Sequence, residues 1–120
     1  MPRILIIGMN PSNKPTKGKT SATFKKLEKW MDELGIQYFS FCNTYDEQAE
    51  AKFSNVDFNR LCTASKGYDK IIALGGFVSA SLSKINIDHF KMPHPSPRNR
   101  LLNDKSFELD VLNKCRSYLK

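Results

Sequence analysis

The feature that most constrains the fold is a short apolar run near the amino terminus, within RILIIGMNPS at residues 3–12. Four consecutive apolar residues at positions 4–7 are typical of a strand buried on both faces, as in parallel α/β sheets. Gly8 allows a sharp turn directly after this strand, and Pro11 stiffens the chain beyond it. We therefore predict that Asn10 is held at the carboxyl end of a central strand, where open α/β sheets bind ligands. An ordinary strand-to-helix turn is the alternative.

Strand and helix patterns alternate along the rest of the chain. Helices are expected from Thr20 or Ser21 to residue 34, from a capping box at 54–57 to residue 65, and over 77–84 and 104–119. Strands are expected over 38–42 and 70–74, with a weaker one over 89–92. This order predicts a three-layer α/β/α domain with a four-stranded, mostly parallel sheet.

Two helices show an apolar stripe that should face this sheet. In the first helix the stripe consists of Leu27, Trp30, Met31 and Leu34, and Lys25, Lys26 and Lys29 should point elsewhere. In the last helix the stripe consists of Phe107, Val111, Cys115 and Leu119.

Unusual residues follow each predicted strand. Asn10, Asn43, the pair Gly75-Gly76, and His94 each follow one of the four strands. Because parallel strands end at the same edge of a sheet, we expect these residues to share that edge. The sequence therefore predicts that this edge is the functional site.

Composition narrows the class of protein. We expect the 120 residues, 40% hydrophobic and 26% charged, to form one domain over 1–120. No apolar run approaches the roughly 18 residues that span a bilayer, and the sequence opens on a strand rather than a signal peptide. Cys42, Cys62 and Cys115 are widely spaced without a CxxC motif, which argues against a disulfide framework or a zinc site. We expect a reducing compartment, cytoplasmic or nucleoid-associated, and no secretion.

The net charge of +7 is the second compositional signal. A small basic domain tends to bind polyanions, of which nucleic acid is the commonest. Solubility alone is the alternative explanation of this charge.

The most specific stretch of the sequence is HPSPRNR at residues 94–100. Its two prolines restrict the backbone, so that His94 and Ser96 project from a stiff loop at low entropic cost. A turn histidine whose ring is satisfied by the backbone is the alternative for His94.

With GMNPS and HPSPRN both present, the chain resembles the uracil-DNA glycosylase superfamily. The nearest patterns are those of the single-strand-selective monofunctional enzymes, with GMNPG and HPSPRN loops, and of the mismatch-specific enzymes, with a GINPG loop. The segment KIIALGGFVSASL at 70–82 is similar to the superfamily's strand-glycine-helix element. These stretches cover about a third of the chain and stand in the expected order.

The resemblance implies a role for each matching residue. Asn10 would hold the attacking water, and His94 would stabilise negative charge on the uracil O2 oxygen. Asn43 would hydrogen-bond the edge of the base. Gly8 and Met9 would belong to the base pocket. No metal or organic cofactor is implied.

Further matches concern the base pocket and the DNA. Phe24 would stack on the flipped base, although a core position in the first helix is an equal alternative. Ser12 stands where the most uracil-specific members carry a tyrosine that blocks 5-substituted bases. Arg98 would fill the hole left in the duplex, and Ser96 would grip a phosphate. We also expect DNA contacts from Lys14, Lys17, Lys19, Asn99 and Arg100.

The sequence departs from the superfamily pattern in three ways. The chain is shorter than most members, Ser12 replaces a glycine, and Arg100 replaces a proline. The prediction is a monomeric, monofunctional glycosylase that acts on uracil or a related damaged or modified pyrimidine in single- or double-stranded DNA. A DNA-binding homologue without turnover and a different nucleobase or nucleotide enzyme remain as alternatives, and β-lyase activity stays open.

Overall fold

The computed structural model describes residues 3–8, 22–44, 56–93 and 104–119. Within these residues, strands and helices alternate as the sequence predicts. The elements are β1 (Ile4–Gly8), α1 (Ala22–Glu33), β2 (Ser40–Asn43), α2 (Phe58–Ser65), β3 (Lys70–Leu74), α3 (Gly76–Lys84), β4 (Phe90–Met92) and α4 (Lys105–Leu119).

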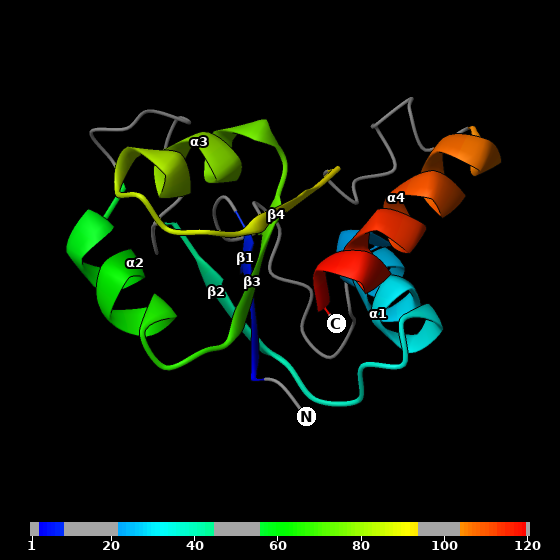
Figure 1. The fold of residues 1–120 in the computed structure, drawn as a ribbon, viewed down its shortest axis with the longest axis horizontal. Helices are drawn as coiled ribbons and strands as arrows, with labels where there is room; N and C mark the ends of the chain where they lie inside the picture. Colours follow the sequence, from blue (N-terminus) through cyan, green and yellow to red (C-terminus); the bar gives the residue numbers. More distant parts are fainter. Residues whose placement is uncertain (1–2, 9–21, 45–55, 94–103, 120) are drawn as a thin grey trace.

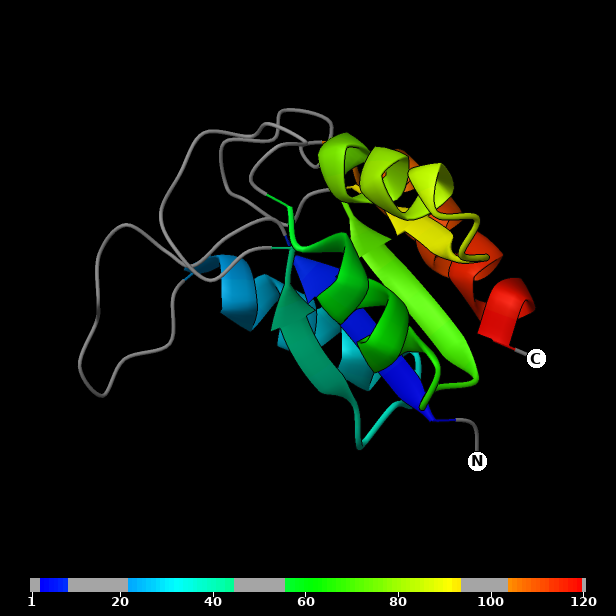
Figure 2. The same ribbon diagram turned by 90° about the vertical axis from the view of Figure 1, so that its left-hand side faces the viewer.

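The described strands form one parallel sheet in the order β2-β1-β3-β4. Figure 2 shows their arrows running side by side in the same direction. As predicted, β1 lies inside the sheet, where it pairs with β2 on one side and β3 on the other. All five of its residues are buried, which explains the unbroken apolar run.

Helices cover both faces of the sheet, which confirms the predicted three-layer α/β/α architecture (Figure 1). Ile4 and Ile6 of β1 face the layer of α1 and α4, where they pack in one core with Trp30. Leu5 and Ile7 face the opposite layer, where they pack with residues of α2 and α3 such as Leu61. This alternation follows from the two-residue period of a strand.

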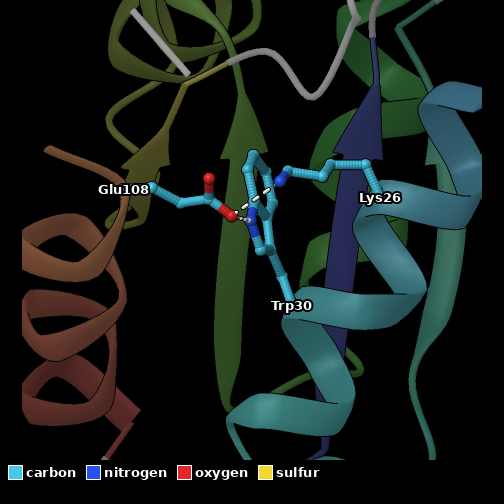
Figure 3. A network of polar contacts seen from close by, with 3 residues as sticks. All are labelled: Lys26, Trp30 and Glu108. Carbon is cyan, nitrogen blue, oxygen red and sulfur yellow. Dashed lines mark hydrogen bonds and ion pairs between the residues drawn. The ribbon is translucent and has the colours of Figure 1, made fainter. Parts of the chain in front are cut away.

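The predicted apolar stripe of α1 is confirmed. Leu27, Trp30 and Met31 are at most 1% exposed, and Leu34 is half-buried against the same core. The prediction for Lys26 is wrong. Its side chain does not point away from the rest of the protein, because its Nζ atom lies 2.8 Å from Glu108 Oε1 on α4 (Figure 3).

The predicted stripe of α4 is confirmed in part. Cys115 is fully buried, and Val111 and Leu119 pack at the margin of the core. Leu112, which the prediction left out, is 3% exposed, whereas Phe107 is half-buried. The face of α4 that carries Leu112 also carries Glu108, which bonds to Trp30 of α1 in the same helical layer, so this face is turned inward.

The start of α2 corrects a second prediction. The capping box was expected to use Ser54 as the N-cap, but the N-cap is Asp57, whose Oδ1 accepts a hydrogen bond from the Arg60 amide at 3.0 Å. Asp57 was predicted to lie inside the helix. A carboxylate at the N-cap accepts a hydrogen bond from an amide that has no partner within the helix. Its negative charge also interacts favourably with the positive end of the helix dipole.

Candidate functional site

The parallel sheet brings the carboxyl ends of its described strands, Gly8, Asn43, Leu74 and Met92, to one side of the molecule. We call this side the carboxyl edge. In the register, Gly8 pairs with Asn43 and Leu74 pairs with Met92. The Gly75 amide then donates a hydrogen bond to the Met92 carbonyl at 2.8 Å. The prediction that Asn43 and the Gly75-Gly76 turn share one edge is confirmed.

Gly8 is at this edge because a larger residue would not fit there. A Cβ atom on Gly8 would lie 2.8 Å from Phe41 Cζ and 3.0 Å from Asn43 Oδ1. Real Cβ atoms essentially never come within 3.0 Å of a heavy atom outside their own residue and its chain neighbours. The Asn43 side-chain amide therefore lies directly beside the backbone of Gly8, the first residue of the GMNPS motif.

The backbone on both sides of the Asn43 amide is held by hydrogen bonds. The Thr44 amide donates to the Gly8 carbonyl at 2.9 Å, and Thr44 itself is fully buried. The Asp57 amide donates to the Thr44 carbonyl at 3.2 Å. The Arg60 guanidinium donates to the Asn43 carbonyl, so the first turn of α2 fixes the end of β2.

The turn after β3 offers backbone donors to the same edge. Gly75 adopts a φ of +92°, which favours glycine, and α3 begins at Gly76 without a side-chain cap. The Lys91 ammonium lies 3.9 Å from the position of a Cβ atom on Gly76. An uncapped helix start beside a lysine favours a negatively charged group.

The other described helices add to this potential. Each of α1 to α4 follows a strand that ends at the carboxyl edge, so their amino-terminal ends point toward it. The first turns of α1 and α3 contain no acidic residue that would neutralise the positive end of the helix dipole, whereas the Asp57 carboxylate caps α2. The edge is therefore suited to anions by the amino termini of α1 and α3 as well as by Lys91.

Most of the predicted site residues lie outside the described residues. Gly8 and Asn43 are described, and they are register partners at the carboxyl edge. Phe24 belongs to α1. The residues outside are Met9, Asn10, Ser12, Lys14, Lys17, Lys19, His94, Ser96, Arg98, Asn99 and Arg100. Asn10 and His94 each stand two positions beyond a described strand end, Gly8 and Met92.

Sequence reasoning missed two cationic residues near this edge, Arg60 and Lys91. Arg60 occupies the first turn of α2, and Lys91 lies on β4. Neither belongs to a motif, and their roles depend on tertiary contacts across the chain. No local pattern indicates Lys91, because it is 15 positions from Gly76 in the sequence and comes near it only in the folded sheet.

Comparisons with known proteins add no assignment. No family model matches the chain, and a search of curated proteins found no match. Among the residues that the structure describes, no three His, Cys, Asp or Glu side chains lie close enough to hold a metal ion. In the same residues, no helix is both long enough and apolar enough to cross a membrane.

Proposed function

We propose that this protein is a monofunctional DNA glycosylase that hydrolyses the N-glycosidic bond of uracil, or of a related damaged or modified pyrimidine, flipped out of DNA. The observation that carries the proposal is the pairing of Gly8 with Asn43 at the carboxyl edge. It supports a site in which the GMNPS loop and the base-reading asparagine act together. The other superfamily-like loop, with His94, follows β4 in the sequence, and β4 ends at the same edge.

The chemistry of Asn43 suits a base reader. A base inside the duplex stack cannot be attacked, so it must be flipped out and recognised on its hydrogen-bonding edge. An amide both donates and accepts, which matches the adjacent carbonyl and imide N–H of uracil. The contacts of Asn43 and Thr44 with Gly8, Asp57 and Arg60 hold the backbone of this reader in place.

Bond cleavage would depend mainly on electrostatics. Water attacks the anomeric carbon, the bond from that carbon to the base nitrogen breaks, and its electron pair leaves with the base as an anion. The proton that the water loses passes to the solvent, from which the departed base is reprotonated. Asn10 is too weak a base to do more than position this water, and His94 would donate to the O2 oxygen of the leaving base. The helix amino termini at this edge support the same anionic species and the DNA phosphates.

The test uses oligonucleotides that contain uracil, hydroxymethyluracil or mispaired thymine, incubated with the full chain and then cleaved with alkali. We expect strand breaks at uracil, and at one 5-substituted base because Ser12 is smaller than tyrosine. Asn10→Ala and His94→Ala should lower the single-turnover rate by about a hundredfold or more, with DNA affinity nearly unchanged. Asn59→Ala, at an exposed position of α2, is the matched control. Absence of breaks at every base would refute the glycosylase proposal.

A DNA-binding homologue without turnover is the second candidate. The net charge of +7 and the uncapped start of α3 favour this candidate, because DNA binding without catalysis explains both features. The same assay separates the two, because this candidate binds the oligonucleotides and leaves every base in place. In either case we propose a monomer that acts in the cytoplasm or nucleoid.

A further inference from the structure

The space beside Gly8 at the carboxyl edge is occupied by the side chain of Phe41 on β2, the strand next to β1 (Figure 2). A Cβ atom on Gly8 would lie 2.8 Å from Phe41 Cζ and 3.5 Å from Phe41 Cε2, two atoms at the tip of the ring. In the register, however, Phe41 pairs with Ile6, two positions before Gly8. The ring therefore leans from its own place on β2 toward the end of β1, and the missing side chain of Gly8 makes room for it.

The ring of Phe41 and the amide of Asn43 are neighbours at this edge. Side chains two positions apart on a strand point to the same face, which here is the face on which Ile6 packs with α1. Asn43 Oδ1 lies 3.0 Å from the same Cβ position that Phe41 Cζ approaches. An aromatic ring and a side-chain amide therefore meet around one point beside the Gly8 backbone.

Phe41 differs from its neighbours on this face in its exposure. Its side chain is 39% exposed, whereas its register partner Ile6 is fully buried. Phe39, two positions earlier in the chain, packs against the core. Part of the Phe41 ring is thus accessible at the strand end, next to a group that forms hydrogen bonds. A nucleobase presents the matching surfaces, because it has a flat face for stacking and a polar edge.

We propose that the flipped base lies with one face against the ring of Phe41 while Asn43 reads its polar edge. The inference rests on the proposed function, because it names a contact of the base that this function flips. It differs from the resemblance, which implies Phe24 for stacking. One strand, β2, then supplies both the ring and the amide.

This arrangement divides the work between the two residues. Stacking needs only a flat face, so Phe41 should strengthen the binding of uracil and of 5-substituted uracils alike. Asn43 should carry the discrimination among bases, because hydrogen-bonding edges differ from base to base. If Phe41 only packs against the end of β1, its replacement changes stability and no contact with the base.

The test locates the ring that touches the base by a photochemical reaction. A single-stranded oligonucleotide with one 5-iodouracil is bound to the Asn10→Ala variant, in which slow turnover should keep the base in place. Under ultraviolet light 5-iodouracil forms a covalent bond to an aromatic side chain stacked on it, and mass spectrometry of the digested protein identifies that residue. We expect the bond at Phe41.

Affinity is measured in addition with an oligonucleotide that contains 2′-fluorodeoxyuridine, whose glycosidic bond resists hydrolysis. Phe41→Leu should weaken its binding about tenfold or more, and Phe41→Tyr, which keeps the ring, should bind nearly as the wild type does. Phe39→Leu is the matched control, because Phe39 packs against the core rather than beside Gly8. Circular dichroism of each variant separates lost binding from lost folding.

The inference is overturned if no photochemical bond forms at Phe41, or if Phe41→Leu binds the fluorinated oligonucleotide as tightly as the wild type. An equal loss of affinity in Phe39→Leu would also contradict it. The alkali assay of the wild type is scored separately. Excision of uracil without these effects refutes the role of Phe41 alone, whereas a bond at Phe41 without excision supports the contact and refutes the glycosylase proposal.

Discussion

Asn43 Oδ1 lies 3.0 Å from the position that a Cβ atom on Gly8 would occupy. The closeness arises because the two residues are register partners at the ends of adjacent parallel strands. Any side chain at position 8 must therefore displace Asn43, Phe41 or the end of β1. The residue at position 8 therefore affects both the packing of the sheet and the placement of Asn43 in the proposed site.

Gly8→Ala is therefore expected to affect both stability and excision. Crowding against Phe41 and Asn43 should lower the free energy of unfolding by about 1–3 kcal/mol. Excision of uracil should fall further than the change in stability explains, because Asn43 moves. Urea unfolding followed by Trp30 fluorescence measures the first effect. Gly67→Ala is the control, since its nearest contact would be the Ala64 carbonyl at 3.8 Å; equal losses in both variants would contradict the prediction.

Arg60→Ala tests the hydrogen bond that fixes the end of β2. Its guanidinium donates to the partly buried Asn43 carbonyl, so its removal should cost about 1–3 kcal/mol of stability. Arg116 is a matched comparison, because its guanidinium donates to the Glu33 carbonyl at 3.0 Å on the exposed surface. We expect Arg116→Ala to cost about 0.5 kcal/mol or less. Thermal unfolding of the two variants side by side decides the point, and the reverse order would refute it.

Glu108→Gln should make the stability of the protein less dependent on pH. Burial would raise the pKa of Glu108, but the hydrogen bonds from Lys26 and Trp30 outweigh it and lower the folded-state pKa from its ordinary value of 4.5. The charge of Glu108 therefore stabilises the fold above that value. As pH falls through the folded-state pKa, this contribution is lost. At pH 7 we expect the wild type to be more stable than Glu108→Gln by about 0.5–1.5 kcal/mol. The difference should disappear in acid, and a constant difference across the titration would contradict the assignment.

DNA affinity is expected to fall steeply with salt. Replacing Lys14, Lys17, Lys19, Arg98 or Arg100 by Gln should each reduce the slope of log affinity against log salt by about one unit, if that residue contacts a phosphate. Lys114→Gln is the control, because Lys114 already pairs with Asp110 at 3.1 Å on α4. Filter binding at several salt concentrations measures the slope. If none of the five substitutions alters the slope, the charge of these residues serves another purpose.

The elements of the fold were predictable because their signals are local. The unbroken apolar run of β1 is typical of a buried strand. The spacing of Leu27, Trp30 and Met31 matches the period of a helix, which puts these residues on one buried face. The alternation of these patterns was enough to predict a parallel sheet, and hence that Gly8 and Asn43 share an edge.

What the sequence did not reveal depends on contacts between distant elements. Glu108 and Trp30 are 78 positions apart, and nothing local indicates that their side chains meet. The same contact turns Leu112 inward, which a helical stripe through Phe107 does not predict. Arg60 was missed for a similar reason, since its role is set by the Asn43 carbonyl 17 positions before it. The arrangement of Asn10 and His94 stays a prediction, because both lie outside the described residues.

The interior position of β1 also constrains how the chain assembles during synthesis. β1 leaves the ribosome well before β3, because the Arg3 amide bonds to the Asp69 carboxylate 66 positions later and β3 begins directly after Asp69. Until β3 emerges, one edge of a fully apolar strand has no partner within the described sheet. Pairing across such a distance is slow, and exposed apolar strands aggregate. Newly made chains should therefore need protection until β3 emerges, and truncation before β3 should yield insoluble protein.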